Sequence, residues 1–291
     1  MNEEIFERYI QAGKAASTIL RKGSDLIRPD ASLAETADQV EQMIIDAGLG
    51  VAFPVNISLN ESAAHDTPSP GDERTFNAGD MVKLDLGAHL DGYIADTAMT
   101  IDLGDQKQLV EASHAARDAA IALVRPGISI GELGTAVAYE IGSRGFRPIA
   151  NLTGHGLDQF QLHMGPNVPN IGGVGGAVLE EGMAIAIEPF ATTGTGYVSD
   201  LKRVEIYSQR LWRPVRMPAS RKILSEIEPL QGLPFARRHL KTAKPDFALT
   251  RLVREGVLHA YPVLADIPGS YVSQSEHTMI VTSDGCIVTT A

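Results

Sequence analysis

The sequence predicts an α+β fold in which one helix-and-strand unit occurs twice. Three observations lead to this prediction: helical periodicity alternates with strand-like apolar runs, capping boxes mark helix starts, and an Asp-Gly pair marks a tight hairpin turn. The chain has 291 residues, of which 44% are hydrophobic, so it can bury a sizeable core as one large domain or two small ones.

Charge and cysteine content narrow the class of protein. A formal net charge of −11 argues against broad nucleic-acid binding, although the segment from Lys202 to Lys244 holds eleven Lys or Arg residues against three acidic ones. The single cysteine, Cys286, excludes an internal disulfide framework and a thiolate metal cage. No apolar run approaches the roughly 18 residues of a membrane span, and the N-terminus lacks a basic segment followed by an apolar one. We therefore expect a cytoplasmic protein.

The first predicted elements are two helices, a strand and a hairpin. Apolar residues recur at helical spacing over residues 3–23, where we expect an amphipathic helix. Ser32 and Glu35 form a capping box ahead of a second helix, which should end near Gly48. The strand-like stretch VAFPVNISL follows directly, and the hairpin covers residues 81–100.

Two further helices are expected downstream of the hairpin. Segments with helical periodicity cover roughly residues 106–124 and 129–143. Another capping box, Ser129 with Glu132, marks the start of the second of these helices.

An internal repeat connects the two groups of elements. RPDASLAE at 28–35 resembles RPGISIGE at 125–132, which lies 97 residues later, and each stretch starts a predicted helix. The strand-like stretches AGDMVKLDL and EEGMAIAIE each place a glycine six residues before an acid, Asp85 in the first and Glu188 in the second. The two matches occur in the same order and indicate a duplicated α/β unit with pseudo-symmetric halves around a shared central cleft.

The hairpin brings two carboxylates to one face of a sheet. If Asp91 and Gly92 form a two-residue loop, Gly87 pairs with Asp96, and Asp85 then shares a face with Asp96. Two converging carboxylates on a half-buried sheet repel each other, so a shared proton, a Lys or Arg, or metal ions must lie between them. A three-residue loop would separate the two side chains.

Three other residues are candidate partners for these carboxylates. His155 lies in a glycine-flanked loop, Glu188 in the apolar stretch AIAIEPF, and Glu276 in the strand-like stretch SQSEHTMIV. A lone glutamate in a strand is more often solvated, and a lone histidine is more often satisfied locally. Their order and spacing along the chain give the three positions additional weight.

Taken together, these residues resemble the metal ligands of a known family. Asp85, Asp96, His155, Glu188 and Glu276 follow the order Asp-Asp-His-Glu-Glu of methionine aminopeptidases and their pita-bread relatives. Four phrases resemble the type 2 subfamily: SLNESAAHDTP at 58–68, GHGLDQFQLHMG at 154–165, EEGMAIAIEPFATTGTG at 180–196 and GSYVSQSEHTMIV at 269–281. The chain length resembles that of archaeal members, because eukaryotic type 2 enzymes add a charged N-terminal extension.

The resemblance implies a curved antiparallel sheet flanked by helices and two divalent metal ions, Co, Mn, Fe or Zn. Asp96 and Glu276 would bridge both ions. Asp85 would complete the coordination of one ion, and His155 and Glu188 that of the other. Water activated between the ions would attack the first peptide carbonyl, and Glu188 would also shuttle the proton.

The family also implies residues that contact the substrate. His65 and His163 occupy the positions of two cleft histidines, which would hold the scissile amide and stabilise the developing oxyanion. Tyr261 matches the tyrosine of the methionine pocket. Ile57 and Phe190 are candidates for the apolar wall, although core packing is the more common role for such residues.

An inserted helical subdomain is expected between the fourth and fifth ligands, where Glu188 and Glu276 are 88 residues apart. We place the insert at 198–259, as irregular and helical structure, and the pita-bread catalytic domain at 1–197 and 260–291. The basic segment lies in this insert. Its positive charges would either bind ribosomal RNA or only keep the helical insert solvated. We expect the protein to be a monomer and to make no contact with a membrane.

Two positions depart from the family pattern. Ser275 replaces a phenylalanine before the last ligand, and we expect it to point away from the metals. Asp66 replaces an aromatic residue after the first cleft histidine. It would either attract the ammonium group of the substrate or be solvated, and we favour solvation.

These observations predict an enzyme that removes the initiator methionine from nascent proteins, preferably when the second residue is small. An Xaa-Pro aminopeptidase of the same fold is one alternative, although the 84 residues before Asp85 leave little room for its usual N-terminal domain. A non-enzymatic RNA- or ribosome-associated pita-bread protein is the other. The presence of all five ligands argues against it.

Overall fold

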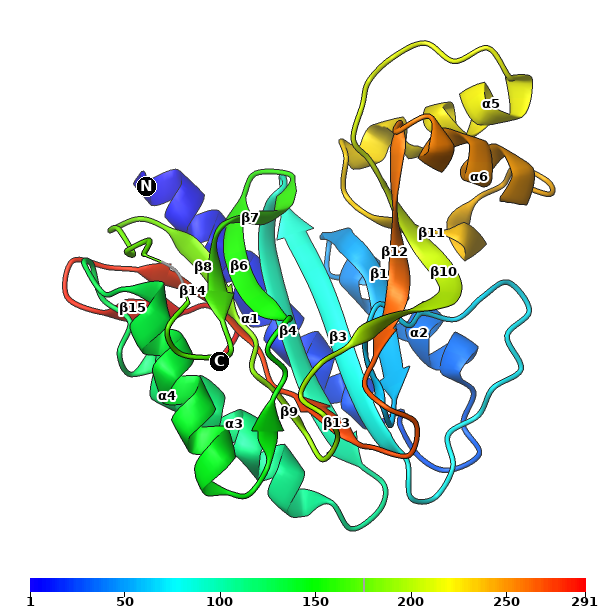
Figure 1. Ribbon diagram of the computed structural model, residues 1–291. Coiled ribbons are helices and arrows are strands. Elements are labelled where there is room, and N and C mark those ends of the chain that lie inside the picture. Colours follow the sequence, from blue (N-terminus) through cyan, green and yellow to red (C-terminus); the bar gives the residue numbers. More distant parts are fainter. Residues whose placement is uncertain (175) are drawn as a thin grey trace.

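Curved antiparallel sheets with helices on their outer faces form the protein (Figure 1). The computed structural model describes residues 1–174 and 176–291. It confirms the predicted α+β class, and within the described residues every strand pair is antiparallel. No helix in this part of the chain is both long enough and apolar enough to cross a membrane.

The first half consists of two helices and a sheet in the order β1-β3-β4. Helices α1 and α2 pack on this sheet, with α1 against β3 and β4 and α2 against β1, and their apolar faces form one core with it. The two helices begin and end close to the predicted positions. The elements of this half are α1 Glu3–Ser24, α2 Leu33–Asp46, β1 Gly50–Leu59, β2 Ser62–Ala64, β3 Met81–Leu90 and β4 Tyr93–Asp102.

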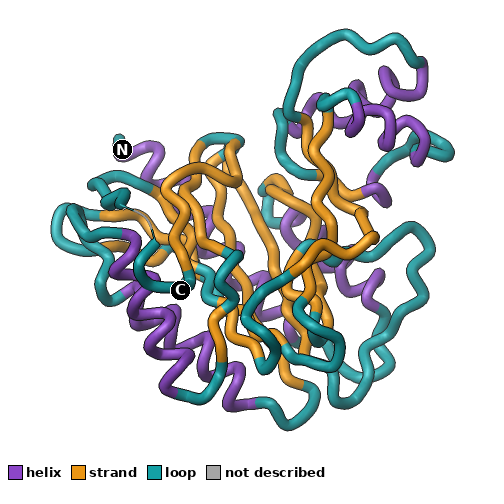
Figure 2. Tube along the Cα trace, in the orientation of Figure 1, coloured by secondary structure: helices purple, strands orange, loops and turns teal. Residues whose placement is uncertain are grey.

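The second half repeats this arrangement with α3 and α4 on its outer face, which Figure 2 shows as a purple layer beside orange strands. Its main sheet has the order β15-β14-β8-β6-β7, and a smaller one has the order β13-β9-β5. The elements are α3 Lys107–Ile121, α4 Ile130–Ser143, β5 Arg147–Pro148, β6 Thr153–Asp158, β7 Gln161–Pro169, β8 Ala184–Ile187, β9 Phe190–Thr192, β13 Val272–Gln274, β14 His277–Val281 and β15 Cys286–Val288.

The segment expected as an irregular and helical insert contains strands as well. It comprises β10 Ser199–Gln209, α5 Pro218–Ile227, η1 Glu228–Leu230, β11 Phe235–Ala236, η2 Arg237–His239, α6 Asp246–Arg254 and β12 Leu258–Ala265. Strand β10 pairs with β11 and β12, and β12 pairs with β2, so this sheet continues into the first half. The expectation for 199–209 was wrong because four charged residues conceal the alternation of β-formers such as Val204 and Ile206.

The hairpin of β3 and β4 has the predicted register. Leu90 pairs with Tyr93, and Gly87 pairs with Asp96. Asp91 and Gly92 have φ of 51° and 89°, the left-handed conformation that a type I′ turn requires at both central residues. The two-residue loop therefore fixes Asp85 and Asp96 on the same face.

The sequence repeat corresponds to equivalent structure in the two halves. Ser32 caps α2 and forms a bridge to Thr75, and Ser129 caps α4 and forms a bridge to Val178. The halves meet where β4 lies against the chain between β13 and β14, through the Glu276 N–H, which donates to the Ala98 carbonyl at 3.0 Å. Residues at matching places in each half thus face a common centre.

Candidate metal centre

The five predicted ligands come from five separate segments and line one pocket. Asp85 lies in β3, Asp96 in β4 and His155 in β6, whereas Glu188 directly follows β8 and Glu276 lies between β13 and β14. Only the folded chain brings them together.

Three of the ligands form a compact group. One ligand atom from each of Asp96, His155 and Glu276 lies within 4.8 Å of the other two. His155 Nε2 is 3.5 Å from Asp96 Oδ2 and 3.6 Å from Glu188 Oε1. These separations leave room for a cation between the imidazole nitrogen and the carboxylate oxygens.

Gln274 links Asp85 to this group. Its Nε2 lies 3.3 Å from Asp85 Oδ2 and 3.5 Å from Glu276 Oε2, so one amide donates to two carboxylates. The side chain is buried, and its position on the chain, two residues before Glu276, is the signal that could have identified it. Sequence reasoning missed this residue.

Backbone contacts set the orientation of His155. Its Nδ1 lies 3.3 Å from the carbonyl oxygen of Gly156, and because a carbonyl only accepts, Nδ1 carries the hydrogen. Burial lowers the pKa of His155 to about 4, so the ring is neutral at pH 7. The lone pair of Nε2 therefore faces Asp96 and Glu188, as metal coordination requires.

The pocket holds four carboxyl groups without a positive side chain. Burial raises the pKa of Asp85 to about 7. Burial first, and then the neighbouring carboxylates, also raises the pKa values of Asp96, Glu188 and Glu276 well above their usual range. Among the described residues that line the pocket, none is a Lys or Arg. The charged forms of these acids therefore need a cation from outside the chain.

Unpaired oxygen atoms show where such a cation fits. Asp85 Oδ1, Asp96 Oδ1 and Glu276 Oε1 are buried and have no hydrogen-bond partner. Buried carboxylate oxygens normally have partners, so these three atoms are free to bind a ligand. Carboxylates with one imidazole, and no thiolate, form a donor set that suits Mn, Fe, Co or Zn. The residues present therefore fit divalent metal ions.

The predicted substrate residues line the same pocket. His65, His163, Phe190 and Tyr261 are all found there. The His163 ring packs against His155 with centroids 4.6 Å apart, and the His65 ring packs against Tyr261 at 5.4 Å. The two histidines and the tyrosine thus form one aromatic wall beside the carboxylates.

Ile57 was wrongly expected in this wall. It is fully buried in the core beneath α1 and α2, whereas its neighbour Asn56 lines the pocket. Because side chains alternate along β1, these two residues point to opposite faces of the strand. Sequence reasoning also missed His259, which precedes Tyr261 by two residues and packs edge-on against it at 4.5 Å.

The two departures from the family pattern have different outcomes. Ser275 accepts a hydrogen bond from Arg117 Nη1 at 2.8 Å, so its hydroxyl faces α3, as expected from a residue next to Glu276. Both expectations for Asp66 were wrong. It is 4% exposed and forms an ion pair with Arg74 at 2.9 Å, so it neither is solvated nor lines the pocket.

Comparisons with known proteins identify the family. The model of metallopeptidase family M24 matches residues 7–283. A methionine aminopeptidase from Archaeoglobus fulgidus is 50% identical over 291 residues, which cover 100% of this chain and 100% of the relative. Among solved structures, one described as a thermophilic Arx1 has a TM-score of 0.91 at 19% identity and covers 99% of this chain and 91% of that chain.

A methionine aminopeptidase structure from Thermotoga maritima has a TM-score of 0.75 at 24% identity, with 100% of this chain and 98% of that chain covered. At such identities the two structural likenesses show the fold alone, which is the predicted pita-bread fold. The family assignment rests on the sequence comparisons, since the M24 model spans most of the chain and the Archaeoglobus relative matches it from end to end. The chain therefore belongs to metallopeptidase family M24 and, within it, to the methionine aminopeptidases.

Proposed function

We propose that this protein removes the initiator methionine from nascent polypeptides, preferably when the second residue is small, with two divalent metal ions. One observation carries the proposal: acids from separate segments converge in a pocket that contains histidines and, among its described lining residues, no Lys or Arg. Bound there, the ions would polarise the first peptide carbonyl and lower the pKa of water. The proposed ligands are Asp85, Asp96, His155, Glu188 and Glu276.

Each ligand has a proposed place. Asp96 and Glu276 would be ligands of both ions, in keeping with the unpaired buried oxygen atom that each of them carries. Asp85 would be a further ligand of one ion, and His155 and Glu188 would be further ligands of the other, in keeping with the 3.6 Å between His155 Nε2 and Glu188 Oε1. Co, Mn, Fe and Zn all suit such ligands.

Glu188 is the proposed proton shuttle. Burial raises its pKa well above the usual range, which makes the carboxylate a stronger base than an exposed glutamate. It would accept the proton of the attacking water and deliver it to the leaving amine.

The two cleft histidines have distinct proposed roles. His65 Nδ1 lies 3.2 Å from the carbonyl oxygen of Pro262 and must donate to it, which leaves the Nε2 lone pair to accept the substrate N–H. His163 would donate to the developing oxyanion. Phe190 and Tyr261 would contact the methionine side chain.

Peptide hydrolysis tests this proposal directly. We expect release of methionine from Met-Ala-Ser, loss of that activity with a chelator, and recovery when Co²⁺ or Mn²⁺ is added back. The Glu188→Ala variant should stay inactive with metal present. Faster cleavage of an Ala-Pro peptide would instead favour the Xaa-Pro alternative, and full activity with the chelator would contradict the metal mechanism.

A second proposal concerns ribosome association through the insert. Trp212 is 68% exposed, and the exposed residues Arg210 and Arg216 lie near it in the stretch RLWRPVR, in which Arg213 donates to the Glu255 carbonyl at 2.6 Å. Exposed arginines around an aromatic ring suit the phosphates and bases of single-stranded or looped RNA. The Arg237 side chain is not available for this purpose, because it is paired with Glu205 and Asp246.

Ribosome pelleting tests the second proposal. The double variant Trp212→Ala with Arg216→Glu should lose salt-sensitive co-sedimentation. Lys14→Glu, an exposed lysine on α1, is the matched control and should co-sediment like the natural chain. Equal co-sedimentation of both variants would remove the RNA-docking proposal.

A further inference from the structure

We propose that the ion network of Asp66, Asp72, Arg74 and Arg203, in which the carboxylates are buried and the arginines are partly exposed, positions the His65 imidazole for the reaction. This inference rests on the proposed function, because His65 is assigned there to hold the substrate amide. None of the four residues lines the pocket, so they would act through His65 and not on the substrate.

His65 has a backbone conformation that needs support. Its φ is 64°, in the left-handed region that side chains other than glycine rarely adopt. Such a conformation costs of the order of 1 kcal/mol and persists only where surrounding contacts enforce it. The imidazole ring of His65 is held by the hydrogen bond between its Nδ1 and the Pro262 carbonyl oxygen.

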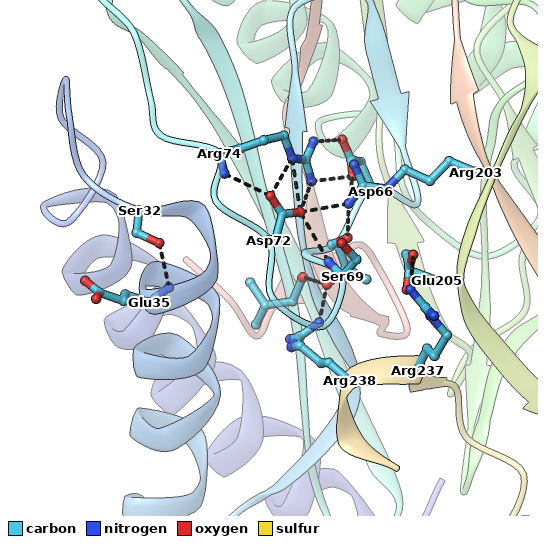
Figure 3. Close-up of polar contacts among 12 residues, drawn as sticks. Ser32, Glu35, Asp66, Ser69, Asp72, Arg74, Arg203, Glu205, Arg237 and Arg238 are labelled. Carbon is cyan, nitrogen blue, oxygen red and sulfur yellow. Dashed lines mark hydrogen bonds and ion pairs between the residues drawn. The ribbon is translucent and has the colours of Figure 1, made fainter. Parts of the chain in front are cut away.

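The residue after His65 is fixed on both its backbone and its side chain. The Asp66 carbonyl accepts a hydrogen bond from the Ile57 N–H at 2.7 Å, which ties it to β1. Its carboxylate receives two parallel hydrogen bonds from Arg74, at 2.9 and 3.1 Å (Figure 3). A bidentate guanidinium fixes direction as well as distance, so the carboxylate has little freedom to rotate.

The same arginine closes the loop that follows His65. Arg74 Nε and Nη2 donate to Asp72 at 3.0 and 2.9 Å, so one guanidinium binds two aspartates (Figure 3). Asp72 in turn accepts a hydrogen bond from the Ser69 N–H at 3.2 Å. The loop 66–74 is therefore clamped by its own side chains.

Arg203 of β10 joins this loop to the insert strand. Its Nη2 donates to the Thr67 carbonyl and to Asp72 Oδ2, each at 3.0 Å, and lies 3.5 Å from Asp66 Oδ1. Thr67 is held from another side, because its hydroxyl accepts a hydrogen bond from Arg238 Nη1 at 2.5 Å. Part of the basic charge of the insert is thus used inside the molecule, beside His65.

A charge-balanced, partly buried network is better suited to fixing geometry than to adding stability. Two aspartates meet two arginines, and the cost of burying them largely cancels their attraction. What such a network supplies is a single arrangement of the backbone that carries it. A small displacement of a substrate-holding group is sufficient to slow a reaction considerably.

The test uses Asp66→Asn, which keeps the shape of the side chain and removes the negative charge that the Arg74 guanidinium binds. We expect about a tenfold loss of kcat/KM on Met-Ala-Ser, with unchanged Mn²⁺ binding in calorimetry. Glu205→Gln is the matched control, since Glu205 is equally buried and accepts a bidentate pair from Arg237 away from His65. It should retain at least half of the activity.

A double-mutant cycle separates positioning from general damage. In a His65→Ala background, Asp66→Asn should cause no further loss, because the residue through which it acts is gone. An equal loss in both backgrounds, or equal effects of Asp66→Asn and Glu205→Gln, would overturn the inference. If Asp66→Asn does not fold, Arg74→Lys replaces it. This variant keeps the positive charge but loses the paired N–H donors, and it should lower kcat/KM in the natural background and not in the His65→Ala background.

The inference can be judged even if the natural chain does not release methionine, which would refute the proposed function alone. In protein labelled at histidine, the ring signal missing from His65→Ala identifies His65. That signal should shift or broaden in Asp66→Asn and stay unchanged in Glu205→Gln. An unchanged signal in Asp66→Asn would overturn the positioning role independently of activity.

Discussion

Two groups of buried carboxylates in this molecule have opposite electrostatic character. In the pocket, burial raises the pKa of Asp85 to about 7, and the described lining residues include no positive side chain. Behind His65, burial would also raise the pKa of Asp72, but the hydrogen bonds from Arg74 outweigh it and hold the pKa well below the usual range. Both groups consist of buried carboxylates, but only the group behind His65 has arginines as partners.

This difference indicates how to tell a binding site from a structural network. Acids that meet arginines inside the fold are neutralised by the chain itself and need no ligand. Acids that converge without a partner remain costly until something positive binds, so they mark a site for a cation.

The largest expected effect is on catalysis at the unpaired group. Glu188→Gln removes a carboxylate that is proposed both to bind metal and to move a proton, so kcat on Met-Ala-Ser should fall by at least about 10³-fold. Steady-state hydrolysis with added Mn²⁺ measures this. A variant within tenfold of the natural chain would show that the pocket acids do not carry the reaction.

The next effect is on stability at the paired group. Asp72→Asn leaves Arg74 and Arg203 without one partner, and should lower the free energy of unfolding at pH 7 by about 2 kcal/mol, allowing for solvent screening. Because the folded-state pKa of Asp72 is lowered, this stabilisation is complete above the ordinary Asp pKa of about 3.9 and is lost as the pH falls below it. Urea unfolding at pH 7 and pH 3 should show the difference between chains shrinking at low pH.

A third prediction concerns the histidine beside the carboxylates. His163→Ala should lower kcat by about 10²-fold, because the proposed donor to the oxyanion is lost, while metal binding is retained. Kinetic measurements with calorimetry on the same sample test both parts. Loss of metal binding together with activity would assign His163 to the metal ligands instead.

The last prediction reverses the usual sign of a mutation at a buried site. In chelator-treated protein, Asp85→Asn should raise the free energy of unfolding at pH 8 by roughly 1 to 3 kcal/mol, since one pKa unit corresponds to about 1.4 kcal/mol. Burial raises the folded-state pKa of Asp85 from 3.8 to about 7, so the folded protein binds the extra proton between these values. Stability from this group is therefore present at low pH and is lost as the pH rises towards 7.

Thermal unfolding at pH 5 and pH 8 tests this prediction. The advantage of Asp85→Asn over the natural chain should be greater at pH 8. With Mn²⁺ present the order should invert, because the natural chain gains a bound ion. A destabilised Asp85→Asn variant in the chelator would mean that the pocket acids are satisfied without metal.

Local signals allowed much of the site to be predicted from the sequence. The Asp91-Gly92 turn set the register of the hairpin, and strand alternation then placed Asp85 and Asp96 together. Both steps depend on neighbours within a few residues. The capping serines and the repeated strand pattern succeeded for the same reason.

The parts that could not be predicted depend on contacts between distant segments. Asp66 is buried because Arg74 and Arg203 reach it, and nothing near it in the sequence indicates that Arg203 of β10 lies there. Gln274 and His259 were missed because their relevance comes from the groups they face. The strand β10 was missed because two of its charged residues bind partners across the fold, Arg203 with Asp72 and Glu205 with Arg237.

Calorimetric titration of chelator-treated protein with Mn²⁺ tests the central claim most directly. If the unpaired acids form a dinuclear site, the natural chain should bind two ions per molecule, and Glu276→Gln, which removes a bridging carboxylate, should bind at most one. If the natural chain shows no saturable Mn²⁺ binding, or if Glu276→Gln still binds two ions, the dinuclear site is contradicted.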